Sequence, residues 1–556
     1  MCGIYAFIEL LKNSSDRRKM FADFMSIKHR GPDMSSFQTI KNVSVGFHRL
    51  AIMDPTFHAN QPYILEDGER TIIFVCNGEI YNFKELIAEY NLPIHNNSDC
   101  MTIPQLYIKL VNEKNDMTQF TELFSRKIKG EFAFVLFEFD KFQDLKNIVA
   151  GRDQIGVRPM YYHCPTEKSN GIIFCSEIKG MLTFKDRVQE FEPGNIINMQ
   201  FDSLGKLSNV FKHDFKTVYN IIPPSSKHVL YTNEIEQLLL KRVRDAFINS
   251  VKRRLTADRP IAFLLSGGVD SSLVVGIANQ ILKQPLRTFC CGMANGTDLR
   301  YARMVADHIK SNHTEVYFTE KEGLDSLEDV NYTIESWDTT TNRASVGQYA
   351  VCKHIGTKTD IKVVLVGEGP DEVCSSYLFN YYAPNGEELH LAAKDYVANI
   401  HQTDGRRADR CISRWGLEGR IPGLDPEFIE AYWSIPSEWR HPKYKGIEKW
   451  WLRKAFDGFN IIPDEVLWRK KEAFSDGVSG KERSWFQMIQ EHVQSKVSVK
   501  DSDTPTIEAQ YFKNLFIETF GRYRLDVLSG YWQPRWINKD GSYVDPSART
   551  LTVYEE

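Results

Sequence analysis

The chain has 556 residues, and its 69 lysines and arginines against 73 aspartates and glutamates leave a formal net charge of −4. This balance gives no basic field for nucleic acid or an anionic membrane surface, while 42% hydrophobic residues suffice for packed interiors. Because the length exceeds what one hydrophobic core supports, we expect roughly two to four domains.

The cysteines and the first residues indicate a reducing compartment. The ten cysteines form no C-x-x-C pair and no metal-like pattern with histidine, so neither a disulfide framework nor a structural zinc site is expected. The sequence also has no apolar stretch of about twenty residues and no signal-peptide pattern. We therefore expect a cytoplasmic protein without a membrane or nucleic-acid partner.

Cys2 is the first candidate catalytic residue in chain order. Removal of Met1 would leave a free α-amine on the carbon that carries the thiol. An α-amine has a pKa of about 7.7–8.0 against about 8.5 for a thiol, so one residue could supply both a nucleophile and its base. The alternative for this residue taken alone is a cysteine packed in the first strand.

Further polar residues follow apolar, strand-like stretches in the first part of the chain. Asn77 and Gly78 could form a tight hairpin turn or the donors of an oxyanion hole, and both uses are compatible. Arg49 could bind a carboxylate, while Glu79 and Asp99 could hold an α-ammonium group. A zwitterionic amino acid would satisfy all three charges, whereas surface charges in solvent are the alternative.

The motifs Cys2-Gly3-Ile4, His29-Arg30-Gly31-Pro32-Asp33 and Asn77-Gly78-Glu79-Ile80-Tyr81-Asn82 resemble those of the N-terminal-nucleophile (Ntn) glutamine amidotransferases, which release ammonia from glutamine. The resemblance implies a four-layered αββα sandwich over residues 1–205. It also implies that Cys2 attacks the glutamine amide while Asn77 and Gly78 stabilise the oxyanion. The implied glutamine pocket is lined by Arg49, Leu50, Ala51, Ile52, Met53, Asn77, Gly78, Glu79 and Asp99.

A polar, irregular stretch follows over residues 206–227 and includes Pro223-Pro224-Ser225-Ser226, which is typical of a linker. We therefore place a second domain at residues 228–556. Apolar residues at helical spacing predict that it begins with a helix over residues 234–254.

Residues 261–276 combine an apolar run, a short Gly-Ser turn and a second apolar run, which predicts a strand, a phosphate-binding loop and a helix. Ser266, Ser271 and Ser272 add hydroxyl donors, and Asp270 beside a phosphate implies Mg²⁺ between them. An ordinary strand-to-helix turn is the alternative. No Walker motif occurs in the chain, and the loop instead resembles that of the ATP pyrophosphatase family, which cuts ATP between the α and β phosphates and adenylylates its substrate.

A second buried strand over residues 361–366 ends in a glycine and three carboxylates. Asp270 and Asp371 could share metal ions bound to pyrophosphate, while Glu368 would face the reacting α-phosphorus. An acidic loop in water is the alternative. The alternation of strands and helices in this half predicts an α/β doubly wound sheet.

Together, the motifs and their order resemble the glutamine-hydrolysing asparagine synthetases over nearly the whole chain. The resemblance implies that ATP is a substrate, surrounded by Leu265, Ser266, Gly267, Gly268, Cys291, Val366 and Gly367. Pyrophosphate and Mg²⁺ would be bound by Asp270, Ser271, Ser272 and Asp371, with Asp270 and Asp371 as metal ligands. The aspartate-side positions would be Thr340, Thr341 and Arg343.

The same resemblance assigns two catalytic roles in the second domain. Glu368 matches the glutamate needed for the β-aspartyl-AMP intermediate, and Lys471 would stabilise charge on the phosphates. Positions that match the family pattern without a further assigned role are Arg407, Asp409, Arg410 and Arg420.

Departures from the family pattern lie in the second ATP loop. The family usually has serine at the positions of Val366 and Pro370, and residues 374–377 replace a more glycine-rich run. Because the Val366 change removes a hydroxyl near the expected adenine site, ATP affinity is the property it affects first.

We thus expect an α+β N-terminal αββα sandwich of the Ntn hydrolase type, followed by an α/β doubly wound synthetase domain with a helical C-terminal part. The expected activity is ATP-dependent synthesis of asparagine from aspartate and glutamine, by a chain that could form a homodimer. One alternative is an adenylating cyclase like the β-lactam synthetases, against which Cys2 argues. The other is a non-catalytic protein that binds ATP or amino acids, suggested only by the altered loop near Val366.

Overall fold

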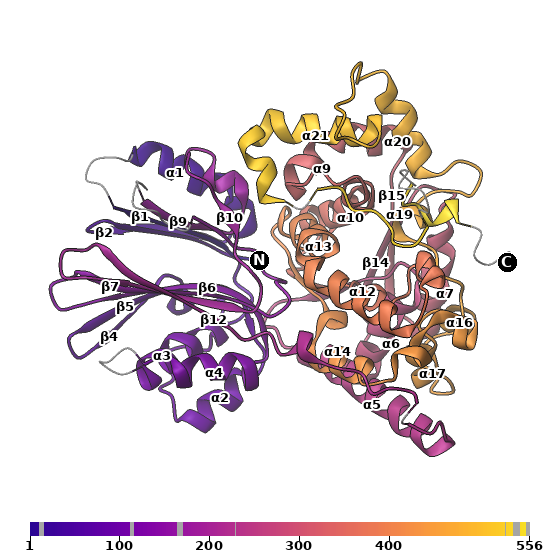
Figure 1. Ribbon diagram of the computed structural model, residues 1–556, viewed down its shortest axis with the longest axis horizontal. Coiled ribbons are helices and arrows are strands. Elements are labelled where there is room, and N and C mark those ends of the chain that lie inside the picture. The colour runs from indigo at the N-terminus through magenta and orange to yellow at the C-terminus, as the bar shows by residue number, and fades with distance from the viewer. Residues whose placement is uncertain are drawn as a thin grey trace.

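The computed structural model describes residues 1–10, 16–111, 116–163, 171–227, 229–528, 530–537 and 545–551. They form two bodies that lie side by side, an N-terminal body built largely of strands and a C-terminal body rich in helices (Figure 1). The mixed α/β composition expected from the sequence is confirmed. Within the described ranges, no helix combines the length and apolar character that crossing a bilayer requires.

Two six-stranded sheets are stacked in the N-terminal body, and the strand pairs within each are antiparallel. The first sheet has the order β10 (Gln189–Glu190), β8 (Tyr161–Tyr162), β9 (Gly171–Cys175), β1 (Gly3–Glu9), β3 (Val43–Arg49) and β2 (Met34–Ile40). The second has the order β12 (Leu207–Asp214), β11 (Asn195–Phe201), β7 (Leu145–Arg152), β6 (Gly130–Phe139), β5 (Arg70–Ile80) and β4 (Tyr63–Asp67). Alternate residues of β5 serve two cores: Ile73 and Val75 pack between the sheets, whereas Phe74 packs on the opposite face.

Helices cover the outer faces of both sheets. Helix α1 (Arg17–Ser26) lies over the first sheet (Figure 1). The second sheet is covered by α2 (Phe83–Tyr90), α3 (Thr102–Leu110) and α4 (Thr118–Arg126). The N-terminal body therefore has four layers in the order α, β, β, α, and the start of β1 places Cys2 at the side that faces the C-terminal body.

The structure corrects the expected linker over residues 206–227. Leu207–Asp214 forms β12, which pairs with β11 from Asn195 opposite Asp214 to Phe201 opposite Leu207. This strand lies at the edge of its sheet and most of its residues are exposed, so it needs no apolar pattern, and its polar sequence looks like a linker. The irregular connection begins after Asp214.

The C-terminal body contains a five-stranded parallel sheet with the order β15 (Asn312–Tyr317), β14 (Arg287–Gly292), β13 (Ile261–Leu264), β16 (Val363–Leu365) and β17 (Glu418–Arg420). From β13 the chain builds outward through β14 to β15, and it then returns to the other side of β13 with β16. The strand order therefore reverses between β13 and β16, and ligands of open α/β sheets bind at such a point, beyond the carboxyl ends of the strands. Both glycine-containing loops noted in the sequence lie there.

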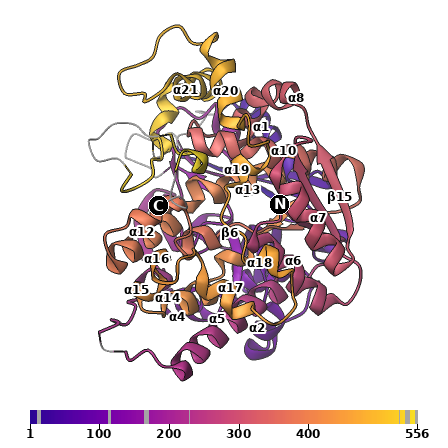
Figure 2. The ribbon, with the colours of Figure 1, turned by 90° about the vertical axis from the view of Figure 1, so that its right-hand side faces the viewer.

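Helices surround this sheet and continue beyond its last strand. Helix α5 begins at Asn233, where Thr232 caps it by accepting from the amide of Ile235, and ends at Arg253, in line with the prediction for residues 234–254. The α-helices that follow α5 and precede β17 are α6 (Val269–Leu282), α7 (Thr297–Ile309), α8 (Glu320–Asp325), α9 (Leu327–Ile334), α10 (Thr339–Lys358), α11 (Pro370–Val373), α12 (Gly386–Asn399) and α13 (Asp404–Ser413). Those after β17 are α14 (Pro426–Trp433), α15 (Ser437–Arg440), α16 (Pro442–Lys445), α17 (Trp450–Phe456), α18 (Asp464–Leu467), α19 (Phe474–Gly477), α20 (Trp485–Gln494) and α21 (Ile507–Phe520). Figure 2 shows α20 and α21 at one end of this body.

Candidate active sites

Cys2 lies against the residues that the sequence predicted around it. Its amide donates to Asn77 Oδ1 over 2.9 Å, and the amide of Leu50 donates to its sulfur over 3.4 Å. Asn77 Nδ2 is buried and has no hydrogen-bond partner in the described part of the chain. The side-chain oxygen of Asn77 is thus fixed while its NH₂ group stays available beside the thiol, as an oxyanion donor requires.

Gly78 follows Asn77 on β5 in a place that excludes any side chain. A Cβ atom at this position would lie 2.2 Å from the carbonyl oxygen of Glu131. The sequence suggested a hairpin turn as one use of the Asn77-Gly78 pair. The structure instead keeps both residues within β5, paired with Ala133 and Phe132 of β6.

Glu79 and Asp99 form a buried acidic group at the end of β5. Burial raises the pKa of Asp99 to about 6 and raises that of Glu79 well above its usual value. Glu418 adds a third carboxylate to the neighbourhood, and Arg420 lies 3.2 Å from Glu79 and donates to Glu418 over 2.8 Å. The raised pKa values mean that a further cation would be favourable here, which fits an α-ammonium group.

Arg49 is used differently from the expectation. Its guanidinium donates to the carbonyl oxygens of Thr56 and Asp54 over 2.7 and 2.5 Å, and to Asn60 Oδ1 over 2.6 Å. It also donates to the carbonyl oxygen of Met53 over 3.2 Å. In this arrangement Arg49 fixes the loop after β3, and both terminal nitrogens of its guanidinium already donate hydrogen bonds to that loop.

The segment after Arg49 lies between Cys2 and the C-terminal body. Leu50, Ala51 and Ile52 are buried, and the carbonyl oxygen of Ile52 accepts from the amide of Asp258 over 3.2 Å. These predicted pocket residues therefore lie beside Cys2, and they also contact the second body.

Met1 is buried between the two bodies. Its amine donates to the carbonyl oxygen of Leu417 over 2.9 Å, and its sulfur lies 2.8 Å from Arg158 and 3.7 Å from Arg30. With Met1 attached, the nitrogen of Cys2 is an amide, and burial raises the pKa of the Cys2 thiol to about 11. The contacts of the Cys2 thiol with Leu50 and of the Cys2 amide with Asn77 are therefore present while the nitrogen of Cys2 is not a free amine.

The second candidate site is the predicted phosphate loop between β13 and α6. Gly267 has a φ of +76°, and a Cβ there would lie 2.5 Å from the amide nitrogen of Ala302. Ser266 and Ser271 hold the loop by a contact of 3.0 Å between their hydroxyl oxygens, and Gly268 caps α6. The loop opens onto a cavity of about 130 Å³, and the residues that line it from the second loop are Gly367, Glu368 and Asp371. The predicted strand ends therefore meet at one pocket.

Four charged side chains bridge the two loops. Lys449 contacts Asp270 and lies 2.5 Å from Asp371, and Lys471 also lies 2.5 Å from Asp371. Burial raises the pKa of Asp270. The two ammonium groups outweigh burial at Asp371 and hold the pKa of that carboxyl well below its usual range. Asp371 is therefore ionised before any substrate binds.

The donor set of this site fits Mg²⁺. Asp270 Oδ1 is buried without a hydrogen-bond partner among the described residues, and carboxylate oxygens are the ligands that Mg²⁺ prefers. No group of three or more histidine, cysteine, aspartate or glutamate side chains that could hold a metal occurs in the described ranges. Asp270 and Asp371 would supply two ligands to a Mg²⁺ ion at this site, and phosphate oxygens the others.

Glu368 faces the same pocket and has two polar partners. Gln348 Nε2 donates to its Oε1 over 3.0 Å, and Arg407 Nη1 lies 3.2 Å from the same oxygen. Burial raises the pKa of Glu368, and Arg407 opposes this rise. A carboxylate with a raised pKa is suited to take up a proton during a reaction.

The predicted aspartate-side residues separate into two places. Thr340 and Thr341 line a cavity of about 110 Å³ that shares Lys471 with the phosphate pocket, and Thr340 Oγ1 is buried without a partner in the described part of the chain. Arg343 is not among the residues that line this cavity, and it donates instead to Glu508 over 2.7 and 2.5 Å and to Asp545 over 2.9 and 3.0 Å. The structure brings the two threonines to the pocket and not Arg343.

Three of the predicted ATP-site residues are buried beneath or beside the two glycine-containing loops. Leu265 is buried, Val366 is 1% exposed, and the thiol of Cys291 donates to the carbonyl oxygen of Gly347 over 3.0 Å. Ser272 is also buried, and its hydroxyl has no partner within the described ranges.

Lys449 and Gln348 are site residues that the sequence analysis missed. Lys449 immediately precedes α17, and its only sequence signal is a lysine before two tryptophans, which a surface helix start would also show. Gln348 lies in the middle of α10, where no motif marks it.

Comparisons with known proteins match both halves of the chain. The family model described as glutamine amidotransferase domain matches residues 1–235, and the one described as asparagine synthase matches residues 242–396 and 387–533. The chain is 38% identical over 588 aligned positions to proteins named asparagine synthetase [glutamine-hydrolyzing] from Homo sapiens and Pongo abelii, covering 100% of this chain and 99% of each relative. The solved glutamine phosphoribosylpyrophosphate amidotransferase from B. subtilis aligns with 53% of this chain and 67% of its own at 13% identity, and its TM-score of 0.32 is too low to support an argument.

Proposed function

Because the chain belongs to the glutamine-hydrolysing asparagine synthetases, we propose that it makes asparagine from aspartate, with glutamine as nitrogen donor and ATP as energy source. The products are asparagine, glutamate, AMP and pyrophosphate. We place the reaction in the cytoplasm. We propose an Ntn-type glutaminase domain over residues 1–214, since β12 belongs to its second sheet, and a synthetase domain over residues 228–556.

In the glutaminase domain, removal of Met1 gives Cys2 a free α-amine that takes the proton of its thiol. The thiolate attacks the amide carbon of glutamine, while the free NH₂ group of Asn77 and the amide of Gly78 stabilise the oxyanion. The C–N bond then breaks, ammonia leaves with the proton held by the α-amine, and water hydrolyses the γ-glutamyl thioester to glutamate and the free thiol. The buried carboxylates of Glu79 and Asp99 hold the α-ammonium group of the substrate. Because Arg49 is engaged by the loop after β3, it binds the substrate carboxylate only if that loop rearranges.

In the synthetase domain, the glycine-rich loop and Ser271 bind the phosphates of ATP. Mg²⁺, held by Asp270 and Asp371, would neutralise phosphate charge, and Lys471 stabilises the negative charge that develops during adenylylation. Aspartate occupies the adjoining cavity beside Thr340, so that its side-chain carboxylate reaches the α-phosphorus. Attack of that carboxylate on the α-phosphorus displaces pyrophosphate and gives β-aspartyl-AMP. Ammonia then attacks its β-carbonyl carbon, Glu368 takes a proton from the ammonia, and the acyl C–O bond breaks to release AMP.

This proposal depends on one observation, which is that a single chain contains both sites. Cys2 lies beside the unpaired NH₂ group of Asn77, and in the other body the glycine-rich loop shares a pocket with the carboxylates of Glu368 and Asp371. The test uses purified protein with Mg-ATP, aspartate and glutamine, and measures asparagine, AMP and pyrophosphate together. Equal yields of the three products are expected, also when ammonium replaces glutamine. AMP and pyrophosphate without asparagine would mean that the acid or the acceptor is another compound, and glutamate alone would mean that the second domain is inactive.

A further inference from the structure

Gln348 holds Glu368 in a hydrogen-bonded ring of three side chains. Its Nε2 donates to Glu368 Oε1 over 3.0 Å, and its own Oε1 accepts from Arg407 Nη1 over 3.0 Å. Arg407 Nη1 also donates to Glu368 Oε1 over 3.2 Å, which closes the ring. Gln348 is 1% exposed and belongs to α10, whereas Arg407 belongs to α13, so side chains of two helices meet at one carboxylate.

The chemistry of its two partners decides which way round the Gln348 amide lies. A guanidinium can only donate hydrogen bonds, so the amide oxygen of Gln348 faces Arg407. The NH₂ group then faces Glu368, to which it donates. A methionine would fill the space without donating, and a glutamate would accept from the guanidinium without donating to the carboxylate. An amide satisfies both neighbours at once.

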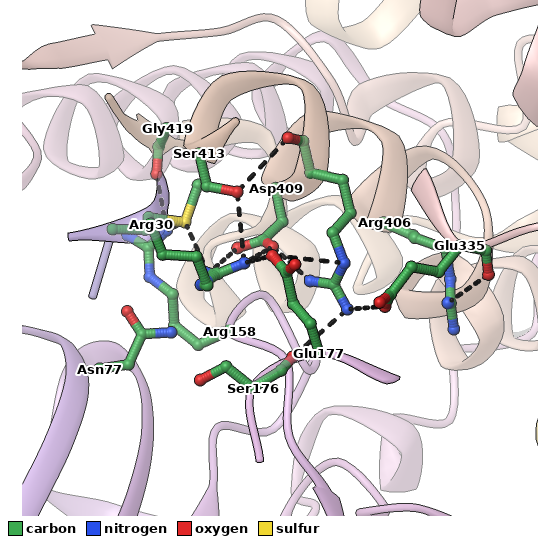
Figure 3. Close-up of polar contacts among 12 residues, drawn as sticks. Arg30, Asn77, Arg158, Ser176, Glu177, Glu335, Arg406, Asp409, Ser413 and Gly419 are labelled. Atoms are coloured by element: carbon green, nitrogen blue, oxygen red, sulfur yellow. Dashed lines mark hydrogen bonds and ion pairs between the residues drawn. The ribbon is translucent and has the colours of Figure 1, made fainter. Parts of the chain in front are cut away.

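Helix α13 presents Arg407 from a fixed position. Asp409 accepts from Arg30 over 2.8 and 3.0 Å, and Arg406 donates to the carbonyl oxygen of Glu335 over 3.1 Å (Figure 3). All four of these residues are buried. Because a movement of the helix would break buried polar contacts, the ring holds the carboxylate against a fixed element.

The contact with Gln348 is compatible with proton uptake by Glu368. Since Oε1 already accepts from two donors, Oε2 is the better proton acceptor of the two oxygens. After protonation at Oε2, Oε1 is a carbonyl oxygen that still accepts from the same NH₂ group. The hydrogen bond is stronger to the charged form, so it favours the ionised base that must be present before ammonia attacks.

The groups that face Glu368 on α13 and α10 differ in charge. Arg407 lowers the pKa of Glu368 and Asp404 raises it. The thiols of Cys352 and Cys411 also lie near, but burial raises the pKa of both, to about 12 for Cys411, so both stay neutral. A substitution of the uncharged amide donor leaves all these charges in place. The charged groups across the pocket that it also leaves in place are Asp270, Asp371, Lys449 and Lys471.

We propose that Gln348 is a positioning residue that orients Glu368 to take a proton from ammonia during the attack on β-aspartyl-AMP. This proposal rests on the proposed function. Gln348 holds Oε1, and Oε2 receives the proton: one N–H bond of ammonia breaks, an O–H bond forms at Oε2, and the nitrogen lone pair forms the new C–N bond. A lost hydrogen bond to a charged group should slow ammonia capture by about 10–100-fold.

The experiment measures asparagine synthesis by the full chain from ammonium, aspartate and Mg-ATP over a range of pH. In Gln348→Met, kcat should fall about 10–100-fold while the KM for ATP changes little. The acid limb of the profile should move up by about one pH unit, because the ionised form of Glu368 loses a donor. The fraction of free ammonia varies with pH identically for every chain, so the ratio of variant to unaltered chain isolates this shift.

Gln348→Glu separates a contact with Arg407 from donation to Glu368. The variant keeps the size of the side chain and can accept from the guanidinium, but it sets a second carboxylate against Glu368 and raises the pKa of that base. Its loss should be at least as large as that of Gln348→Met. A role limited to holding Arg407 would instead leave Gln348→Glu at the normal rate.

Gln510→Met is the matched control. Gln510 is 3% exposed in α21 of the same body, and its Nε2 donates to the carboxylate of Asp501 over 3.4 Å. The change removes another buried amide with a carboxylate partner, at a residue that does not line the phosphate pocket. The control should keep the rate and the pH profile of the unaltered chain.

A double change tests whether Gln348 acts through Glu368. Glu368→Gln combined with Gln348→Met should be no slower than Glu368→Gln alone, because a positioning residue has no effect once the base that it positions is gone. If Gln348→Met does not fold, Gln348→Glu takes its place in this comparison.

Three results would overturn the proposal: a normal rate and pH profile in Gln348→Glu, an equal loss in Gln510→Met, or a loss in the double variant equal to the product of the two single losses. Failure of the unaltered chain to make asparagine from ammonium would instead contradict the proposed function.

Discussion

Lys449 donates from its buried ammonium group to Asp371 over 2.5 Å and also contacts Asp270, so it stands between the two carboxylates that we propose as Mg²⁺ ligands. An ammonium group in this place keeps Asp270 and Asp371 from repelling each other before substrate arrives. If Mg²⁺ and phosphate bind there as proposed, the ammonium group of Lys449 would be available to donate to phosphate oxygens.

The first prediction follows from the two roles of Lys449, which are to neutralise Asp270 and Asp371 before ATP binds and to contact phosphate afterwards. Lys449→Met should lower kcat/KM for ATP by about 10²–10³-fold, because the site loses a preorganised cation for the developing phosphate charge. Glutamine hydrolysis without ATP should stay unchanged. Initial rates of pyrophosphate release against ATP concentration give the measurement, and Lys443→Met, at an exposed lysine of the same segment, is the control. Equal ATP kinetics in the two variants would show that Lys449 has only a structural role.

Cys2→Ala gives the second prediction. Without the thiol no covalent intermediate can form, so glutamine-driven synthesis should fall by at least about 10³-fold. Synthesis from ammonium should persist, because the phosphate pocket lies in the other body and shares no residue with Cys2. Asparagine is measured with each nitrogen source in turn. Loss of both activities would contradict separate sites.

Glu368→Gln provides the converse prediction. The variant keeps the contact with Gln348 in size and shape but cannot take up a proton, so asparagine synthesis from either nitrogen source should fall by about 10²–10⁴-fold. Glutamine hydrolysis measured as glutamate release should persist. Asparagine synthesis at the normal rate would rule out the assigned role of Glu368.

Residues of both candidate sites could be picked out from the sequence because each belongs to a short motif. Cys2 stands in Cys2-Gly3-Ile4, Asn77 stands beside Gly78, and Asp270 follows the glycine-rich loop, although Cys2 meets Asn77 only through folding across 75 residues. Lys449 could not be predicted in the same way, since it meets Asp270 only through packing between segments 179 residues apart in the chain.

The structure also assigns partners that a residue type cannot reveal. Arg49 and Arg343 suit a carboxylate substrate in the sequence, yet both are engaged by groups of the protein. The edge strand β12 has the composition of a linker, because only one side of it is paired in the sheet.

The pH dependence of glutamine binding gives the fourth prediction. Burial raises the pKa of Asp99 to about 6, so this carboxyl is largely neutral at pH values well below 6 and ionised well above it. Since the α-ammonium group needs the ionised form, glutamine should bind more tightly as the pH rises through about 6. Calorimetry on Cys2→Ala isolates binding from hydrolysis, and the additional change Asp99→Asn should weaken binding and remove this part of the pH dependence. A flat profile with Asp99 intact would contradict the assignment.

Arg343→Met is the last prediction, and it separates a structural role from a substrate-binding role. The guanidinium is 3% exposed and neutralises Glu508 and Asp545, so its removal leaves two carboxylates short of a counter-charge. Breaking such a buried pair costs about 3–5 kcal/mol of unfolding free energy, and the double change Arg343→Met with Glu508→Gln should recover part of it. Denaturant unfolding measures the loss, and the KM for aspartate is measured on the fraction that stays folded. A large rise in that KM with unchanged stability would instead place Arg343 on the substrate, as the family resemblance implies.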